Sequence, residues 1–255
     1  MKQLHPYKIG KKVLWFDSVT STNTKAVEIM LREHKAHGIV VVADEQTHGR
    51  GRVNRKWISP RDGGVWCSII IKLENKKDVL LYTQAASLTV VRLLEFYGIR
   101  AQLRWPNDVY VMKKKIGGVL LEVHSKQHDE KFLIVGIGLN VNFSEDSTPD
   151  YLKMKMTDMH RLLNNAPKPD RKEVLQKLLE IFSSYCHFIS SGDRQRVIKE
   201  WKDNIVLERK EIKIVIGKRC IMGKPVTLRD DGGLVIEARN GAREIVHAGE
   251  VFFEA

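Results

Sequence analysis

The order of hydrophobic and polar residues predicts a mixture of strands and helices up to about residue 205. Apolar, β-branched runs at Val13–Phe16, Ile39–Ala43 and Val65–Leu73 are typical of strands. The second run is apolar throughout, which is the pattern of a strand buried on both faces. Between the first two runs, a stretch rich in Ser, Thr and Asn (Ser18–Thr24) precedes an amphipathic helix.

A long helix and a further set of strands are predicted next. Leu80–Tyr97 has the length and composition of a helix, and Gly98 stands where a glycine closes a helix C-terminus. The remaining elements of this part are strands at Gln102–Trp105, Val109–Met112, Ile116–Val123 and Phe132–Phe143, and helices at Arg171–Ile189 and Asp193–Trp201.

From Glu211 onward the pattern changes to short β segments with a turn signal about every ten residues, which is typical of a small sandwich or barrel. The segments are Glu211–Gly217, Arg219–Gly223, Pro225–Ala238 and Arg243–Phe253, with a hairpin turn expected at Gly232–Gly233. We therefore predict an α+β protein with two domains, residues 1–206 and 207–255. So short a second domain forms a marginal core alone and is expected to lean on the first.

The composition is that of an ordinary globular protein with an excess of basic residues. The chain has 43 Lys and Arg against 31 Asp and Glu, a net charge of +12. This excess fits nucleic acid, an acidic protein partner, anionic small substrates or simply solvated lysines. Three cysteines, Cys67, Cys186 and Cys220, are too few and too widely spaced for a disulfide framework or a zinc site. With no apolar leader and no run of about 18 apolar residues, we expect a cytoplasmic protein.

The segment HGRGRVNRKW (His48–Trp57), called the arginine loop below, needs a chemical explanation. Its three arginines and its lysine repel one another, and two glycines weaken regular structure. Arg50, Arg52 and Arg55 keep their charge at physiological pH, and each guanidinium matches a carboxylate or a phosphate. The loop therefore suits a reaction that brings two anions together, such as a carboxylate and a nucleotide phosphate. Charge repulsion also predicts that the loop is mobile until a ligand binds. From composition alone, a solvated basic loop or a nucleic-acid-binding stretch is the alternative.

Five short motifs occur in one characteristic order. They are Ser21-Thr22-Asn23, Gln46 with the following Gly49–Arg52, RWPNDV (Arg104–Val109), KIGGVLLE (Lys115–Glu122) and GIGLNVN (Gly136–Asn142). Together they resemble the biotin protein ligases, and the resemblance extends over nearly the whole chain. Arg104 departs from the lysine common at its position, and Asn54 replaces a glycine often found in the loop. Asparagine tolerates positive φ, so the loop geometry is compatible with this change.

The resemblance implies a catalytic domain of the biotin–lipoate ligase type, a mixed sheet packed with helices as in class II synthetases, and an SH3-like C-terminal domain. It also implies a monofunctional enzyme with two steps. Biotin's carboxylate attacks the α-phosphate of ATP, giving biotinyl-5′-AMP and pyrophosphate. A lysine of a biotin carboxyl carrier domain then takes the biotin and releases AMP. Mg²⁺ arrives with ATP, and a homodimer without specific DNA binding or a membrane partner is expected.

The resemblance also assigns roles to individual residues. The catalytic set is Arg52, Arg55, Asp108 and Lys115. The biotin-binding set is Ser21, Thr22, Asn23, Gln46, Arg50, Gly51, Arg52, Lys115, Gly117 and Gly118. The nucleotide-binding set is Arg52, Arg55, Trp57, Lys115 and Asn140. No protein ligand for a metal is predicted, and no P-loop motif occurs as an alternative ATP site.

These residues also have plain structural interpretations. Lys115 fits a solvated turn, Asp108 a Pro-Asn-Asp turn, Ser21 a helix cap and Trp57 a core side chain. Two other functions stay open from the sequence. One is a lipoate–protein ligase of the same superfamily. The other is a DNA-binding repressor, although only 20 residues precede Ser21 and an N-terminal helix-turn-helix needs several dozen.

Overall fold

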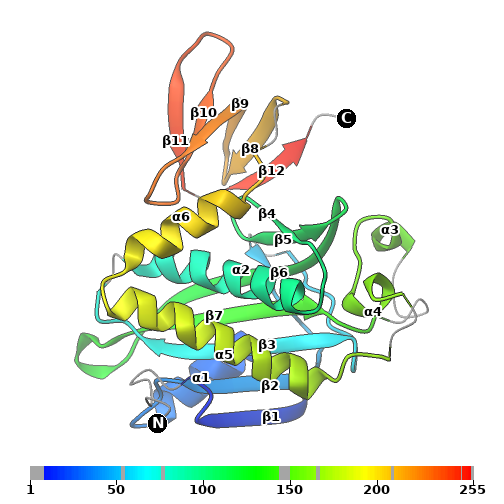
Figure 1. The fold of residues 1–255 in the computed structure, drawn as a ribbon. Helices are drawn as coiled ribbons and strands as arrows, with labels where there is room; N and C mark the ends of the chain where they lie inside the picture. The colour runs from blue at the N-terminus through cyan, green and yellow to red at the C-terminus, as the bar shows by residue number, and fades with distance from the viewer. Residues whose placement is uncertain are drawn as a thin grey trace.

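The computed structural model describes residues 9–52, 55–75, 78–143, 150–164, 167–207, 210–247 and 249–253. Within these residues the strands form two sheets, one in the lower body of the molecule and one above it (Figure 1). The larger sheet contains β1 (Lys12–Val19), β2 (Ile39–Gln46), β3 (Gly64–Lys72), β4 (Gln102–Arg104), β5 (Asp108–Val111), β6 (Lys114–Ser125) and β7 (Lys131–Asn140). Their order in space is β1-β2-β3-β7-β6-β5-β4. The predicted strands of this part are thus confirmed, with shifts of a few residues at their ends.

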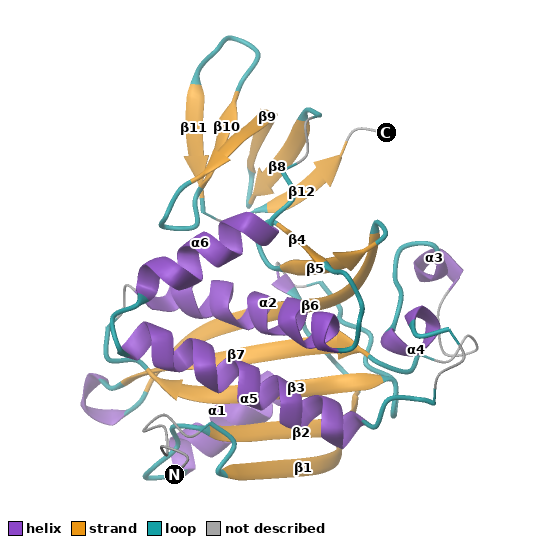
Figure 2. Cartoon of the chain, viewed as in Figure 1, coloured by secondary structure: helices purple, strands orange, loops and turns teal. Residues whose placement is uncertain are grey.

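Helices cover both faces of this sheet (Figure 2). The helix α1 (Thr22–Arg32) packs on one face, and α2 (Val79–Phe96), α5 (Arg171–Ser190) and α6 (Arg194–Asn204) pack on the other. Alternate residues of the central strands supply the two cores, as the two-residue period of a strand requires. Val40 and Val42 face α2 and α5, whereas Val41 packs with Met30 of α1. This double burial explains why the central strands are continuously apolar.

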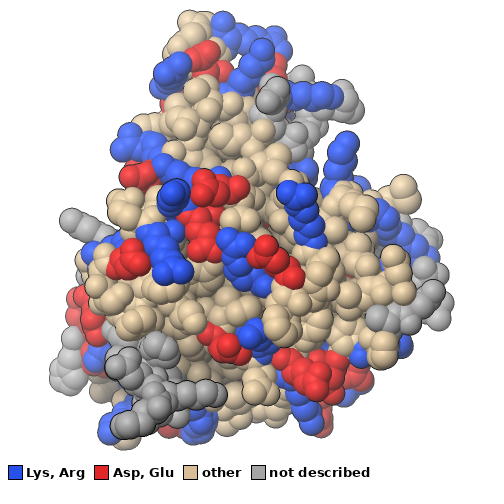
Figure 3. All heavy atoms as spheres, viewed as in Figure 1, with Lys and Arg blue, Asp and Glu red and all other residues tan. Residues whose placement is uncertain are grey.

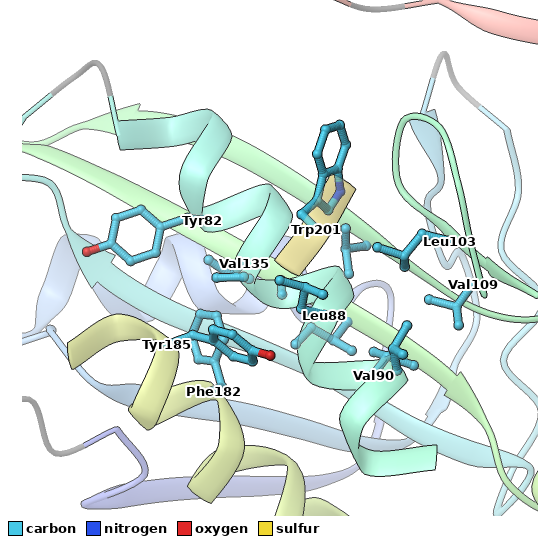
Figure 4. Close-up of a cluster of buried hydrophobic side chains, with 14 of the residues drawn as sticks. Tyr82, Leu88, Val90, Leu103, Val109, Val135, Phe182, Tyr185 and Trp201 are labelled. Carbon is cyan, nitrogen blue, oxygen red and sulfur yellow. The ribbon is translucent and has the colours of Figure 1, made fainter. Parts of the chain in front are cut away.

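The core on the α2 side is the larger of the two (Figure 4). Leu88 and Val90 of α2, Val135 of β7 and Phe182 of α5 all belong to this cluster. These side chains are all fully buried. A buried apolar side chain contributes about 1.5–3 kcal/mol relative to an exposed one, so this layer dominates the stability of the larger domain.

The helix α2 ends as predicted. Gly98 has φ +75°, and its N–H donates to the carbonyl of Glu95 while the N–H of Ile99 donates to the carbonyl of Leu94, each at 2.9 Å. This is the glycine-dependent C-terminal cap expected from the sequence. The expectation that no segment has the length and hydropathy of a membrane span is wrong for α2, which meets that criterion by length and composition. Its apolar side chains, including Leu93 and Leu94, are instead buried in the core.

Three short elements were not predicted. They are a 3₁₀ turn at Gln127–Asp129 and the helices α3 (Asp150–Lys153) and α4 (Met159–Leu162). Each spans about one turn or less, which is too short to produce a helical repeat of apolar residues. The start of α4 has a local signal, because Oδ1 of Asp158 accepts a hydrogen bond from the backbone N–H of Arg161.

The second sheet contains β8 (Ile212–Ile216), β9 (Arg219–Leu228), β10 (Leu234–Glu237), β11 (Arg243–Val246) and β12 (Glu250–Phe253), in the spatial order β11-β10-β9-β8-β12. Two segments predicted separately, Arg219–Gly223 and the start of Pro225–Ala238, form the single strand β9. The hairpin turn at Gly232 is confirmed, with φ +79°.

The second sheet leans on the larger domain, as expected. Leu234 and Ile236 belong to the same hydrophobic cluster as Trp201 of α6. Nε1 of Trp105 donates to the carbonyl of Gly232 at 3.0 Å, which ties the hairpin turn to the segment between β4 and β5. The boundary between residues 206 and 207 stays a prediction.

Candidate active site

A cavity of about 200 Å³ lies beside the arginine loop, on the α1-facing side of β6 and β7. Its wall comes from the start of α1, the end of β2, the arginine loop, the turn between β4 and β5, and the strands β6 and β7. Gly249 and Val251 extend the wall from the second sheet. The predicted residues that line the cavity are Ser21, Thr22, Asn23, Gln46, Arg50, Gly51, Arg52, Arg55, Trp57, Asp108, Lys115 and Gly118. Motifs that are distant in sequence therefore converge on one site.

Two predicted residues, Gly117 and Asn140, lie outside this wall. A Cβ atom on Gly117 would stand 3.3 Å from Cγ1 of Val90 in α2, so this residue faces the other side of the sheet. Asn140 is buried further along β7, where its Nδ2 donates to the carbonyl of Thr157 at 3.0 Å. For Gly117 the reason is the strand period: neighbours such as Gly117 and Gly118 cannot share a face of β6.

Glycines form the floor of the cavity. A Cβ atom on Gly136 would stand 2.3 Å from Oδ1 of Asn23, and one on Gly138 would stand 2.7 Å from the ring of Trp57. Both distances are shorter than real Cβ contacts, so a side chain at either position would displace Asn23 or Trp57. The sequence signal was alternate glycines within an apolar strand, which often marks a close approach.

Polar residues at the start of α1 and the end of β2 form one connected network. The backbone N–H of Thr22 donates to Oε1 of Gln46 at 2.8 Å, and Nε2 of Gln46 donates to the hydroxyl of Ser59 at 2.7 Å. The hydroxyl of Ser68 donates to Oδ1 of Asn23 at 2.6 Å. Thr22, Asn23 and Ser68 are all buried. The network fixes donors and acceptors at one end of the cavity; Ser68 was missed because it lies in an apolar strand outside the motifs.

Ser21 occupies the N-cap position of α1, with extended backbone at φ −155° and ψ 137°. Among the described residues its side chain makes no capping hydrogen bond. The cap interpretation is therefore correct for the position and wrong for the side chain, which lines the cavity.

Arg50 differs from the other arginines of the loop because it forms an ion pair with Glu122 of β6. Its Oε2 lies 2.8 Å from Nη2 of Arg50 and accepts a hydrogen bond from Nδ2 of Asn23 at 2.6 Å. Arg50 is thereby paired with a carboxylate of the protein, and its interaction orients Asn23 rather than presenting an unopposed charge. Glu122 ends the KIGGVLLE motif, but nothing local predicts its partner 72 residues away.

The arginine loop is anchored at several points. The backbone N–H of Gly51 donates to the carbonyl of Arg55 at 2.6 Å, and the N–H of Trp57 donates to the carbonyl of Gly49 at 2.9 Å. Nη1 of Arg52 donates to Oδ1 of Asn107 at 3.3 Å. Val53 and Asn54, including the predicted departure at Asn54, lie outside the described residues. The predicted mobility of the empty loop stays a prediction.

A β-bulge between β5 and β6 brings Lys115 to the cavity. Tyr110 pairs with Lys115 and Val109 pairs with Gly117, which leaves Ile116 as the extra residue. Ile116 is fully buried in the core on the α2 side, the side that Gly117 also faces. Because two consecutive residues face the core there, Lys115 points to the opposite side, into the cavity.

Lys115 and Asp108 form the ion pair at the centre of the site. Nζ of Lys115 lies 2.7 Å from Oδ1 of Asp108, and also 5.1 Å from the centre of the Trp57 ring. Both side chains of the pair are about a third exposed to the cavity or solvent. The backbone of Lys115 is held independently, since its N–H donates to the carbonyl of Lys155 and its carbonyl accepts from Thr157, both at 2.9 Å. The solvated-turn interpretation of Lys115 is thus replaced by a fixed ammonium.

Two titratable side chains of the wall are kept neutral at physiological pH. Burial raises the pKa of the Cys67 thiol to about 12, so this cysteine is not a thiolate nucleophile. Burial and then the negative charge of Asp108 raise the pKa of the Tyr110 phenol. The ring of Tyr110 in turn stacks under the Arg104 guanidinium, whose carbon lies 4.1 Å from the ring centre. In the part of the chain that the structure describes, no cluster of three or more His, Cys, Asp or Glu is placed to hold a metal ion.

Comparison with known proteins identifies the family of the chain. Residues 15–142 match the model of the biotin/lipoate A/B protein ligase family. The chain belongs to this family. It is 30% identical over 243 residues to the bifunctional ligase/repressor BirA of Bacillus subtilis, covering 94% of this chain and 74% of that protein. It is 24% identical to the biotin–[acetyl-CoA-carboxylase] ligase of Mycobacterium tuberculosis, covering 98% of this chain and 94% of that protein.

The fold comparison agrees. The structure of a biotin protein ligase from Aquifex aeolicus in complex with biotin and ATP is similar, with a TM-score of 0.78 and 32% identity. The match covers 95% of this chain and 98% of that chain. Both the mixed sheet with its helices and the small C-terminal sheet thus follow the biotin protein ligases within the biotin/lipoate ligase family, as the resemblance implied.

Proposed function

We propose that this chain is a biotin protein ligase, which activates biotin with ATP and transfers it to a lysine of an acceptor protein. The observation that carries the proposal is the convergence of three parts in one cavity. A donor–acceptor network of the buried Thr22 and Asn23 with the half-buried Gln46 lies at one end. The Lys115–Asp108 ion pair and the loop residues Arg52 and Arg55 line the same cavity.

The network suits the ureido ring of biotin. That ring presents two N–H donors and one carbonyl acceptor, so it needs a surface that offers both kinds of group. The Asn23 and Gln46 side chains each carry a donor and an acceptor, and both are held in place by neighbours rather than free to rotate. A rigid, buried network rejects a ligand that leaves its polar atoms unpaired. This supports biotin over lipoate, whose dithiolane ring has no N–H group.

The first step needs positive charge. A carboxylate oxygen of biotin attacks the α-phosphorus of ATP, a new C–O–P bridge forms, and the bond to the β-phosphate breaks to release pyrophosphate. Lys115, Arg52 and Arg55 supply cations that offset the repulsion between the two anions and stabilise charge in the transition state. Arg50 takes a different part, because its ion pair with Glu122 holds the carboxylate that orients Asn23.

The second step needs an uncharged amine. The ε-amine of the acceptor lysine attacks the acyl carbon of biotinyl-5′-AMP, a C–N bond forms, and the C–O bond to AMP breaks. The ammonium of the incoming lysine must lose a proton first, and the carboxylate of Asp108 is the group of the cavity placed to accept it. Asp108 therefore acts as base and Lys115 as the cation that holds it.

The test is direct. Purified protein is incubated with ATP, Mg²⁺ and biotin, and pyrophosphate and biotinyl-5′-AMP are measured; a biotin carboxyl carrier domain is then added and the modified lysine is located by mass spectrometry. Parallel reactions receive lipoate. Absence of pyrophosphate release with biotin would remove the proposal, and faster release with lipoate would replace it by a lipoate–protein ligase.

We further propose that the acceptor is the biotin carboxyl carrier domain of a biotin-dependent carboxylase, and that the protein is a homodimer. Residues 121–125 of β6 support the homodimer, because they lie beyond the part of β6 that pairs with β5 and form a sheet edge with Val123 49% exposed. Such an edge can pair with a second copy. Analytical ultracentrifugation of wild type and Val123→Lys tests this: the variant is expected to be monomeric.

No sequence-specific DNA binding is proposed, although the Bacillus relative is a bifunctional ligase/repressor. The face drawn in Figure 3 carries acidic and basic side chains side by side over α5 and α6, rather than a basic stripe. Arg92 of α2 and Glu200 of α6 form an ion pair, and Lys177 and Glu180 form another within α5. A gel-shift experiment across salt concentrations checks the point, since specific retardation would contradict it.

A further inference from the structure

A second cavity lies on the other side of the turn that carries Asp108. Its volume is about 340 Å³, and it is enclosed by the N-terminal half of α2, the α2-facing side of β6, Trp201 of α6 and the β9–β10 hairpin turn. It shares Arg52, the Trp105–Asn107 segment, Val119 and Leu120 with the first cavity. The two cavities are therefore neighbours, separated by the segment that precedes Asp108.

The side-chain amide of Gln84 in α2 is buried at this cavity without a hydrogen-bond partner among the described residues. It is 2% exposed, and within the part of the chain that the structure describes neither its Oε1 nor its Nε2 has a hydrogen-bond partner. Its neighbour Thr83, which also lines the cavity, is satisfied by the carbonyl of Val79 in its own helix. A buried amide with both polar atoms unpaired destabilises a fold, so a glutamine at this position calls for a partner from outside.

The chemistry of the cavity defines that partner. The Gln84 side chain offers one acceptor and one NH₂ donor side by side, which complement the N–H and the C=O of a peptide backbone. Around it, Val79, Leu80 and Leu121 present apolar surface suited to an aliphatic side chain. Arg52 is the one lysine or arginine among the described residues of this wall, so a neutral segment fits better than a phosphate-bearing ligand.

We propose that this second cavity binds the acceptor protein next to its target lysine. It takes an apolar side chain of the acceptor together with the neighbouring backbone amide, which pairs with Gln84. The inference rests on the proposed function, because it needs an acceptor whose lysine enters the first cavity beside Asp108. Gln84 is thus a residue for acceptor recognition, and it takes no part in activating biotin.

The experiment separates the two half-reactions. The variant Gln84→Leu has nearly the shape of the wild-type side chain without its polar atoms, and Leu80→Trp fills the same cavity from its exposed rim. Gln176→Leu makes the same chemical change on the exposed face of α5 and is the matched control. For each protein, pyrophosphate release, transfer from preformed biotinyl-5′-AMP to hydroxylamine, and transfer to a biotin carboxyl carrier domain are measured, with the melting temperature.

The expected result is a split. Gln84→Leu and Leu80→Trp raise the KM for the carrier domain about tenfold, the effect of losing one or two hydrogen bonds or the pocket. Pyrophosphate release and transfer to hydroxylamine stay at wild-type rates, and Gln84→Leu melts at a higher temperature than wild type. Gln176→Leu matches wild type throughout.

Three results would overturn the inference. An unchanged KM for the carrier domain in both variants would show that the cavity is not used. A weaker affinity for ATP or biotin in Gln84→Leu would assign the cavity to a small substrate instead. A lower melting temperature in Gln84→Leu would give Gln84 a structural role. Loss of pyrophosphate release in the wild-type protein would instead count against the proposed function.

Discussion

Nζ of Lys115 lies 2.7 Å from Oδ1 of Asp108, across the bulged pairing of β5 and β6. The pair brings a fixed cation and a fixed carboxylate into the same cavity, and the two half-reactions need one of each. The first step joins two anions and depends on the cation. The second step removes a proton from an ammonium and depends on the carboxylate. We therefore expect substitution of Lys115 to slow the first step and substitution of Asp108 to slow the second.

Replacing Lys115 by Met is expected to slow biotinyl-5′-AMP formation by about 10²–10³-fold, because a preorganised positive group is lost from a charged transition state. The rate is measured as pyrophosphate release under saturating biotin and ATP. Lys113→Met, at an exposed position in the turn two residues away, is the matched control and should match wild type. Similar rates for the two variants would contradict the role of Lys115.

Replacing Asp108 by Asn removes the proton acceptor and keeps the shape of the side chain. Transfer of biotin from preformed biotinyl-5′-AMP to the carrier domain should fall by about 10²–10⁴-fold, the usual contribution of a general base. Hydroxylamine is largely unprotonated at neutral pH, so its reaction with the adenylate should be nearly unaffected. An equal loss with both nucleophiles would assign Asp108 a structural role.

Arg52→Ala should raise the activation free energy of biotinyl-5′-AMP formation by about 1.5–3 kcal/mol, the range for a lost hydrogen bond to a charged group. The reaction is therefore slower. The hydrogen bond from Arg52 to Asn107 also disappears, so the loop becomes less well placed. Arg61→Ala, outside the cavity wall, serves as the control. Wild-type rates in Arg52→Ala would contradict the cationic loop.

Gly136→Ala should raise the KM for biotin strongly while leaving the KM for ATP much less changed. The new methyl group would stand 2.3 Å from Oδ1 of Asn23, so the Asn23 amide must leave its position in the network. Gly118→Ala is a graded comparison, since its nearest neighbours would be Oδ1 of Asp108 at 3.2 Å and side-chain carbons at 3.4 Å. A smaller effect of Gly136→Ala than of Gly118→Ala would be inconsistent with this geometry.

Away from the site, the carboxylate of Asp44 is expected to stabilise the folded protein in a way that is lost in acid. Burial alone would raise the pKa of its carboxyl, but hydrogen bonds from Arg171 at 2.6 Å and Trp15 at 2.8 Å outweigh burial and lower it. A lowered pKa in the folded state stabilises the protein above the usual value of 3.8, and this stabilisation is lost as the pH falls through the folded-state value.

The variant Asp44→Asn measures that contribution. Its free energy of unfolding should be about 1–3 kcal/mol lower than that of wild type at neutral pH. This difference should shrink toward zero in acid. Unfolding by urea at a series of pH values gives the free energies. Asp17→Asn, at an exposed position of the neighbouring edge strand β1, is the matched control and should change the free energy of unfolding by less than about 0.5 kcal/mol at neutral pH. A difference that persists unchanged in acid would show that the ionised carboxylate is not its source.

The sequence alone determined the elements of the larger domain and most of the candidate site. Apolar runs such as Ile39–Ala43 and the glycine cap at Gly98 act locally, so their meaning does not depend on the rest of the chain. The motifs likewise predicted that Lys115, Asp108 and Arg52 belong to one site. What local pattern could not determine was which side of a strand each residue faces.

Only the tertiary structure determined the side of the sheet to which each side chain points. It thereby also determined which role each residue can have in the site. A bulge of one residue turns Lys115 into the cavity and Ile116 into the core, and the same register leaves Gly117 on the wrong side for a ligand. The pairing of Arg50 with Glu122 and the unpaired amide of Gln84 arise from packing between distant segments. A shift of one residue reverses every side chain of a strand, so these roles depend on register, which the whole fold sets.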